Sequence, residues 1–193
     1  MIVYFVRHAQ PDYSSGSDDY SFGLSGEGIM DRYAAADILK DVSFDKIYCS
    51  PYKRAVQTIQ PIADYCGMEI ITDERLRERV HGENSNNTEM FRRRWEDHSF
   101  HEPGGESIAD VQKRYLSVME EIIKANSYGT VLVGTHGTAI CSFINHFIPE
   151  FGFDDFMRTI DYMPWVIKIE FSGMKLYKME ELGFVQKEFH GVK

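Results

Sequence analysis

The stretch Ile2-Val3-Tyr4-Phe5-Val6-Arg7-His8 decides the fold, because an unbroken apolar run ends abruptly in a cation and an imidazole. β-Branched and aromatic residues without polar alternation predict a strand that is covered on both faces, as in a parallel sheet wrapped by helices. Functional groups in such sheets lie at the carboxyl ends of the strands. Taken alone, the Arg7-His8 pair is more typical of an ordinary surface pair at the end of an edge strand, without a function. The rest of the chain has to show whether this strand end is functional.

Two later segments repeat the pattern of an apolar strand that ends at reactive residues. Residues 45–49 predict a strand, and Ser50-Pro51 follow as the N-cap and first residue of a helix with Arg54 in its first turn. Residues 130–135 predict another strand, which ends at His136-Gly137. Repeated strand and helix units imply a mainly parallel sheet. The three strand ends then bring two arginines and two histidines to one edge of that sheet.

Apolar periodicity and turn signals predict the remaining elements. Together they imply a three-layer α/β sandwich, a mainly parallel central sheet flanked by helices. The predicted elements are a long loop over 10–23, a helix capped by Ser25 with Ile29, Tyr33, Ala36 and Leu39 on one face, a strand over 68–72, a solvated charged loop over 73–79, a helix capped by Ser107, a helix after Gly137, and a hairpin around Ser172-Gly173.

The polar segment 80–103 is predicted to be an insertion that covers the site, and we call it the lid segment. It lacks strand alternation, and a short helix is predicted around residues 89–98. Three consecutive arginines, Arg92 to Arg94, lie on that helix. A run of charges is usually a solvated helix face, and recruitment of an anionic substrate is the second interpretation. We expect residues 1–193 to form a single domain that contains this insertion.

The overall composition excludes several classes of protein. A net charge of −9 argues against a general nucleic-acid or anionic-membrane surface, so any anion site must be local. Cys49, Cys66 and Cys141 are odd in number and lie in or beside apolar segments, which is typical of reduced cytosolic thiols. The start lacks a signal-like pattern and no apolar run approaches the length of a membrane span. We expect a cytoplasmic protein.

The converging strand ends predict a pocket for a tetrahedral dianion. Guanidinium groups, a helix N-terminus and imidazole N–H groups all suit phosphate oxygens. A neutral imidazole can attack phosphorus while the arginines stabilise the negative charge, and a carboxylic acid must protonate the departing alkoxide. Glu78 follows a strand end and is the candidate acid.

Six short motifs, in this order, resemble the histidine phosphatase superfamily, also called the phosphoglycerate mutase-like family, over nearly the whole chain. They are RHAQ at 7–10, LSGEG at 24–28, SPYKRAVQT at 50–58, LRER at 76–79, PGGES at 103–107 and THG at 135–137. Two positions differ from the usual family pattern, because Ala9 replaces a glycine and Ser14 stands where many members have an asparagine.

The resemblance implies a role for each site residue. His8 becomes phosphohistidine, Glu78 donates the proton, and Arg7, Arg54 and His136 hold the phosphoryl group. No metal or other cofactor is expected. The further positions expected to bind phosphate are Gln10, Ser14, Arg79 and Gly137.

Three alternatives to this assignment were weighed. Cysteine-dependent phosphatases place five residues between cysteine and arginine, whereas four separate Cys49 from Arg54. A metal site built on His8, His81 and His136 is disfavoured because Arg7 and Arg54 would repel a cation. A non-catalytic phosphate-binding module stays open, although His8, Glu78 and His136 argue against it.

A phosphoglycerate mutase is the main alternative function, and it needs a closed cover that keeps water from phosphohistidine. The segment between Glu78 and Pro103 is short for such a cover. We therefore expect a phosphatase whose partner is a small phosphorylated metabolite. The identity of that metabolite and the oligomeric state are beyond what the sequence determines.

Overall fold

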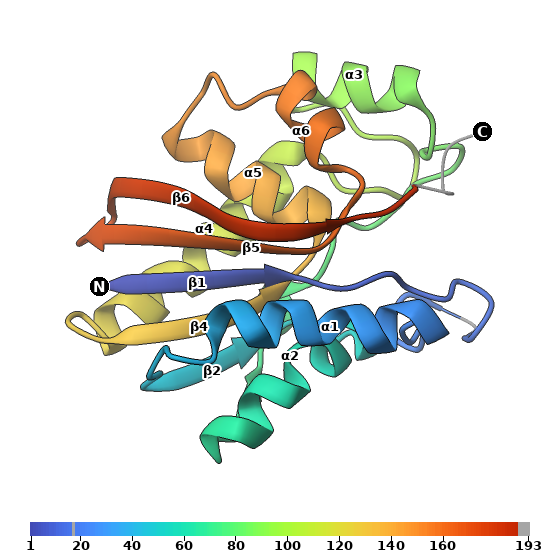
Figure 1. Ribbon diagram of the computed structural model, residues 1–193. Helices are drawn as coiled ribbons and strands as arrows, with labels where there is room; N and C mark the ends of the chain where they lie inside the picture. The colour runs from blue at the N-terminus through green and yellow to red at the C-terminus, as the bar shows by residue number, and fades with distance from the viewer. Residues whose placement is uncertain (17, 189–193) are drawn as a thin grey trace.

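A computed structural model describes residues 1–16 and 18–188 of the chain. Its centre is a six-stranded sheet (Figure 1) whose strands, in spatial order, are β3 (Ile70–Thr72), β2 (Lys46–Cys49), β4 (Thr130–Thr135), β1 (Ile2–Arg7), β5 (Tyr162–Ser172) and β6 (Lys175–Gln186). The four strands from β3 to β1 are parallel, β5 is antiparallel to β1, and β6 is antiparallel to β5. The carboxyl ends of β1, β2 and β4 therefore share one edge, as predicted.

Helices cover both faces of the sheet, which confirms the predicted three layers (Figure 1). On one face, two helices pack with Val6 and Leu132 in a buried apolar cluster. On the other face, two helices pack with Phe5 and Val133. The first pair is α1 (Gly26–Leu39) and α2 (Lys53–Cys66), and the second is α4 (Ile108–Ala125) and α5 (Gly137–Phe147). Within the described residues, none of the helices is both long and apolar enough to span a membrane.

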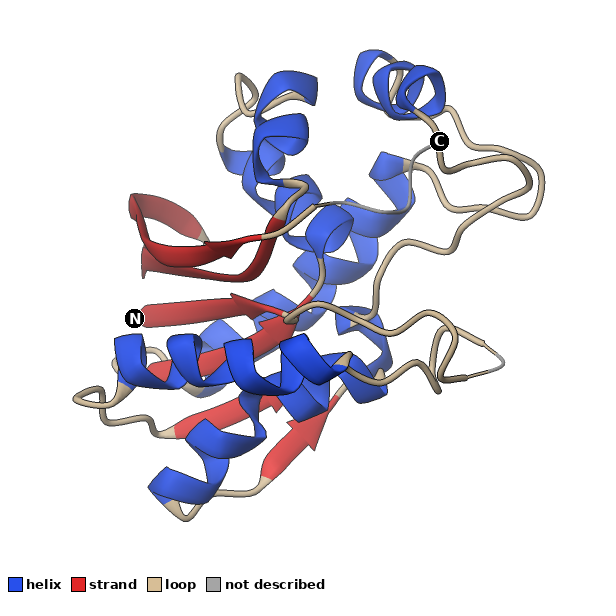
Figure 2. Ribbon diagram, turned by 45° about the vertical axis from the view of Figure 1, so that its right-hand side comes forward, coloured by secondary structure: helices blue, strands red, loops and turns tan. Residues whose placement is uncertain are grey.

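Two short helices lie beside the carboxyl edge of the sheet. They are α3 (Thr88–Glu96), within the lid segment, and α6 (Phe153–Thr159). The Phe156 ring of α6 lies 5.4 Å from Phe91 and 5.6 Å from Trp95 of α3, measured between ring centroids. Figure 2 shows long loops gathered around this end of the molecule. Helix α6 was not predicted, because seven residues are too few to display a helical apolar period.

The helix predicted to start at Ser50-Pro51 begins at Lys53 instead, so the predicted N-cap was wrong. The Ser50 hydroxyl lies 2.7 Å from Nε2 of His136, and the backbone of Tyr52 is extended (φ −64°, ψ 129°). The serine is thus held by the site, and the chain turns once more before it becomes helical. Arg54 still lies in the first turn.

The predicted buried face of α1 was also partly wrong. Tyr33 is 48% exposed, whereas Gly28, Ala35 and Leu39 are buried. A Cβ atom at Gly28 would lie 2.2 Å from the carbonyl oxygen of Gln10. The helix start therefore lies close against the loop after β1, and Ala35, not Tyr33, is on the buried side of the helix.

Candidate active site

His8 lies at the carboxyl end of β1 and is 5% exposed. Its Nδ1 is 2.8 Å from the carbonyl oxygen of Ala9. A carbonyl oxygen only accepts, so Nδ1 carries the proton and Nε2 keeps its lone pair. Burial, followed by the charges of Arg54 and Arg7, lowers the pKa of His8 well below its usual value. The imidazole is consequently neutral near pH 7 and has the tautomer that a nucleophile requires.

Thr58 of α2 fixes the backbone immediately after His8. Its Oγ1 accepts a hydrogen bond from the backbone N–H of Ala9 at 2.9 Å and donates to the carbonyl oxygen of Arg54 at 2.7 Å. The hydroxyl is fully buried. Thr58 thus links the strand that carries the candidate nucleophile to the helix that carries Arg54, a role that the sequence reasoning missed.

Arg7 is buried, and both terminal nitrogens of its guanidinium are engaged at the end of α6. Nη1 donates to the carbonyl oxygen of Thr159 at 2.6 Å, and Nη2 donates to that of Ile160 at 3.0 Å. Its Nε is buried without a partner in the described part of the chain. A Cβ atom at Gly137 would lie 3.1 Å from Cζ of Arg7, so a larger residue there would crowd the guanidinium. Arg7 therefore joins α6 to the candidate site.

Arg54 is 3% exposed and contacts the tip of the loop that follows β1. Its Nη1 donates to the carbonyl oxygen of Asp19 at 2.6 Å, and its Nη2 lies 3.9 Å from the Asp19 carboxylate. The guanidinium also lies over the Tyr52 ring, 4.7 Å from its centroid. The sequence reasoning missed Asp19, because a carboxylate in a polar loop carries no signal of its partner.

His136 directly follows β4 and is fully buried beside His8, with ring centroids 5.2 Å apart. Its Nε2 is held by the Ser50 hydroxyl, while Nδ1 is buried without a partner among the described residues. Burial lowers the pKa of His136 well below its usual value, and Arg54 adds to this effect. The ring is therefore neutral and its orientation is set by Ser50.

Glu78 is 8% exposed, and its carboxylate contacts the first turn of α5. One carboxylate oxygen accepts hydrogen bonds from the backbone N–H groups of Arg79 at 2.8 Å and Ala139 at 2.9 Å, and the other accepts from Thr138 at 3.0 Å. These contacts fix the carboxylate beside the strand end that carries His136.

The segment around Glu78 is buried and braced by ion pairs, so the predicted solvated loop over 73–79 was wrong. Leu76 and Arg79 are at most 1% exposed. Arg114 of α4 donates to the carbonyl oxygens of residues 75, 77 and 78, and to Glu106. Although burial alone would raise it, hydrogen bonds from Arg77 and Arg114 lower the pKa of Glu106 to about 2. These pairings explain how a highly charged segment can be buried.

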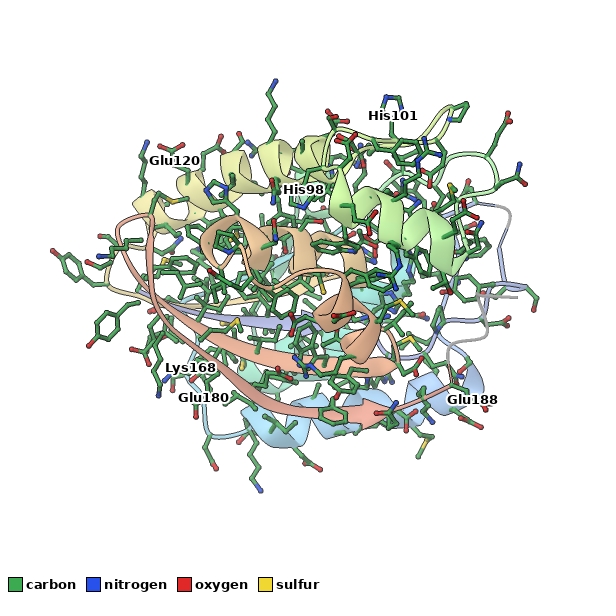
Figure 3. All side chains as sticks on the ribbon, turned by 90° about the horizontal axis from the view of Figure 1, so that it is seen from above. His98, His101, Glu120, Lys168, Glu180 and Glu188 are labelled. Carbon is green, nitrogen blue, oxygen red and sulfur yellow. The ribbon has the colours of Figure 1, made fainter. Side chains whose placement is uncertain are left out.

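A cavity of about 230 Å³ connects the predicted site with the lid segment and α6. Figure 3 shows Glu120, Glu180 and Glu188 at the periphery of the molecule. From the predicted site, the cavity is lined by Arg7, His8, Arg54, Glu78, Arg79 and Gly137. From other segments, its lining includes Asp19, His81, Phe91, Arg94 and Phe156.

Besides the fully buried His136, two of the predicted phosphate-binding residues, Ser14 and Gln10, lie outside the cavity lining. Ser14 is exposed, and its hydroxyl donates to the Asp12 carboxylate at 2.6 Å. The Gln10 side chain accepts from the Ser25 hydroxyl at 3.1 Å. The roles proposed for both residues stay predictions. In the structure, Ser14 contacts the loop after β1 and Gln10 contacts the start of α1.

The three lid arginines differ in their surroundings. Arg92 and Arg93 are exposed, and their guanidinium groups lie over the rings of Phe153 and Phe100. Arg94 is 3% exposed and lines the cavity. The sequence alone could not distinguish these environments, because the packing of α3 on α6 decides which side of the helix faces the cavity.

Comparison with known proteins identifies the family. A model described as "Histidine phosphatase superfamily (branch 1)" matches residues 3–175. A curated relative, putative phosphoserine phosphatase 2 of Hydrogenobacter thermophilus, is 31% identical over 153 residues, which cover 70% of this chain and 72% of the relative. The probable phosphoglycerate mutase GpmB of Yersinia pestis is 26% identical over 153 residues, covering 72% and 70% respectively.

A solved structure of a similar fold is that of phosphoserine phosphatase from Entamoeba histolytica in complex with 3-phosphoglyceric acid. It matches 98% of this chain and 98% of its own, with a TM-score of 0.74 and 21% sequence identity. At this identity the likeness supports the fold, which agrees with the three-layer architecture.

Proposed function

Because this chain belongs to the histidine phosphatase superfamily, we propose that it is a metal-independent phosphatase that hydrolyses a small phosphomonoester through a phosphohistidine on His8. The observation that carries the proposal is the state of His8: it lines the cavity beside two arginines, is neutral, and has its proton fixed on Nδ1. The small cavity supports a substrate of metabolite size. We propose a cytoplasmic location, which the three free cysteines support.

In the first chemical step, Nε2 of His8 attacks phosphorus. The N–P bond forms as the ester P–O bond breaks, and protonated Glu78 gives its proton to the leaving alkoxide. Arg54, Nε of Arg7 and Nδ1–H of His136 stabilise the negative charge on the phosphoryl oxygens. The bond from Nδ1–H of His8 to the Ala9 carbonyl supports the positive charge on the phosphorylated ring.

In the second step, Glu78 takes a proton from water as the water oxygen attacks phosphorus. The N–P bond breaks, inorganic phosphate forms, and His8 returns to its neutral state. No step requires a divalent cation, and the arginines that surround the phosphoryl group would repel one. We further propose that residues 1–193 work as one domain, with the lid segment closing the cavity.

The test is to trap the intermediate. Incubation with a ³²P-labelled phosphomonoester and a rapid denaturing quench should give protein-bound phosphate that is labile in acid and stable in base. The label should disappear on a chase with unlabelled substrate and should be absent from His8→Ala. Label that persists in His8→Ala would overturn the assignment of the nucleophile.

A phosphoglycerate mutase is the second candidate, favoured by the similarity to GpmB proteins. A mutase must hold the dephosphorylated intermediate while excluding water, and the lid segment here has one short helix, α3. We expect phosphate release to exceed interconversion of 3- and 2-phosphoglycerate, even with bisphosphoglycerate supplied. Mutase turnover well above phosphate release in the same assay would establish the alternative.

A further inference from the structure

Helix α6 packs against the lid helix α3 through aromatic side chains (Figure 1). Phe156 of α6 contacts Phe91 and Trp95 of α3, and all three side chains are buried. The guanidinium of Arg92, also on α3, lies over the ring of Phe153, 4.1 Å from its centroid. Phe153 and Phe156 lie one turn apart on α6. The position of α3 is therefore linked to that of α6 over most of the length of the shorter helix.

The C-terminal end of α6 contacts Arg7 of the candidate site. The last carbonyl groups of a helix have no partner within the helix, and here those of Thr159 and Ile160 accept from Nη1 and Nη2 of Arg7. Thr159 is 1% exposed, and its hydroxyl donates back to the carbonyl oxygens of Asp155 and Phe156. Arg7 is thus fixed to the same short helix on which α3 packs.

These two bonds decide where the remaining donor of Arg7 points. A guanidinium is planar and rigid, so fixing both terminal nitrogens also fixes Nε. That Nε is buried and has no partner in the described part of the chain, and Arg7 lines the same cavity as His8. A group displaced by about 1 Å at a reacting centre can cost roughly 10²-fold in rate. A shift of α6 would therefore change the phosphoryl site even if every residue at the strand ends stayed the same.

We propose that α6 is a positioning element that ties the lid helix α3 to Arg7 and so sets the place of the Arg7 Nε donor at the phosphoryl site. Trp95 and Phe156 are then positioning residues, which act on the reaction through Arg7. The inference rests on the proposed function, because it takes the strand ends as the phosphoryl site. It adds a coupling to that function: an anion bound at Arg7 and the packing of α3 on α6 stabilise each other.

Trp95 separates this coupling from direct contact with a substrate. Phe91 and Arg94 line the cavity together with Arg79, on the side that we call the lid wall. Trp95 is not among the cavity-lining residues of the described chain, and its ring centroid lies 5.6 Å from that of Phe156. The simpler interpretation is that the bonds at the end of α6 only cap the helix, as bonds from basic side chains often do. In that case a change at Trp95 would leave the phosphoryl site unaffected.

A double-mutant cycle between Trp95 and Arg7 tests the coupling, with inorganic phosphate as the probe. Its dissociation constant is measured by isothermal titration in the wild type, Trp95→Leu, Arg7→Met and the double variant. Trp95→Leu should weaken phosphate binding about 5-fold or more in the wild type, but by less than about 2-fold once Arg7→Met has removed the bonds to α6. An effect of Trp95→Leu that was equal in both backgrounds, or absent from the wild type, would overturn the coupling.

The reverse direction is measured by the fluorescence of Trp95. The chain has two tryptophans, so Trp165→Phe leaves Trp95 as the single reporter. Saturating phosphate should change the emission of Trp95, and this change should be lost when Arg7→Met is added. Unchanged emission in Trp165→Phe, or a change that persists with Arg7→Met, would contradict the linkage.

Two variants separate positioning from stability. Trp95→Phe keeps an aromatic ring against Phe156 and should restore most of the phosphate affinity. Phe171→Leu changes a buried aromatic residue at the opposite edge of the sheet, where the Phe171 N–H donates to the carbonyl oxygen of Met1. It should lower the thermal midpoint and leave phosphate binding unchanged. Phosphate binding that Phe171→Leu weakened as much as Trp95→Leu would show that lost stability alone explains the effect.

Failure of the coupling and failure of the proposed function give different results. The cycle measures binding only, so it decides the coupling even where no reaction occurs. A wild type that binds phosphate but hydrolyses none of the phosphomonoesters tested would overturn the phosphatase alone. A wild type that does not bind phosphate would overturn the proposed phosphoryl site, and the coupling with it.

Discussion

The two ends of the cavity are built in different ways. At the strand ends, His8, Glu78 and His136 are fixed through backbone groups and buried hydroxyls that belong to the sheet and its helices. At the lid wall, Arg79 and Arg94 are held mainly by ion pairs to one carboxylate and by loop carbonyls. The difference teaches that the proposed bond-making groups are held by regular structure, whereas the lid wall is held by side-chain ion pairs. Mutations at the two ends should therefore fail in different ways.

The largest effect is expected at the strand end, from His8→Ala. Removing a nucleophile costs on the order of 10⁴-fold or more in kcat, and the loss should be the same for substrates with and without a carboxylate. Phosphate release from phosphoserine and from 4-nitrophenyl phosphate measures both losses. Binding of inorganic phosphate, followed by isothermal titration, should survive because the arginines remain. Substantial turnover by His8→Ala would contradict the assignment of the nucleophile and, with it, the proposed difference between the two ends of the cavity.

Glu78→Gln should give the next largest effect, and one that depends on the leaving group. A general acid contributes roughly 10²- to 10⁴-fold, so hydrolysis of alkyl phosphates should fall by that factor. Nitrophenolate leaves without a proton, so its phosphorylation step should be much less affected. A series of aryl and alkyl phosphates measures the dependence, and equal losses across it would remove Glu78 as the acid. Glutamine at this position keeps one oxygen acceptor toward α5, which limits the structural disturbance.

Arg54→Ala should slow turnover by about 10²-fold, as loss of one preorganised donor does, and should weaken inhibition by phosphate. It should also shift the pH profile. Arg54 is one of the charges that lower the pKa of His8, so its removal raises that pKa. The acid limb of kcat/KM, where His8 becomes protonated, should move to higher pH. An unchanged acid limb together with unchanged phosphate inhibition would place Arg54 outside the phosphoryl site.

The two ends of the cavity also differ in how well the sequence predicts their structure. The sheet and its flanking helices follow from apolar periodicity and caps, as the helix after Ser107 shows: the predicted cap is formed, and the apolar side chains of Ile108, Val111 and Tyr115 are buried at helical spacing. The strand-end residues were identified because parallel topology alone brings their backbones to one edge. Arg7, His8, Arg54 and Glu78 do line one cavity.

What the sequence could not show depends on side-chain partners far apart in the chain. The buried state of Arg79 comes from Glu102 and from Glu106, more than twenty positions later. Asp19 reaches Arg54 through an irregular loop whose path no local pattern specifies. Ser50 looked like a helix cap because its local sequence fits one, yet its hydroxyl contacts His136, which follows another strand. Local patterns carry no information on such pairings.

The smallest effect is expected at Ser50, a strand-end residue that we expect to act on the reaction only through His136. The Ser50 hydroxyl accepts from the Tyr52 N–H at 3.3 Å and can donate its own proton to Nε2 of His136. That arrangement leaves the proton of the neutral ring on the unpartnered Nδ1, the group that we propose binds a phosphoryl oxygen. Ser50→Ala should lower kcat by about 10-fold, the value of a single hydrogen bond, with little change in KM. Ser50→Thr, which keeps the hydroxyl, should recover most of the rate.

A merely structural role for Ser50 makes a different prediction. Alanine would then lower the thermal midpoint without changing the state of the ring. In ¹⁵N-NMR spectra of histidine-labelled protein, the tautomer of His136 should be the Nδ1–H form in the wild type and a mixture in Ser50→Ala, because nothing then distinguishes the two ring nitrogens. A serine that matters only for packing would leave this tautomer unmixed. In that case β4 and α5 alone would orient His136. The geometry at the strand ends would then depend on the backbone and not on the Ser50 hydroxyl.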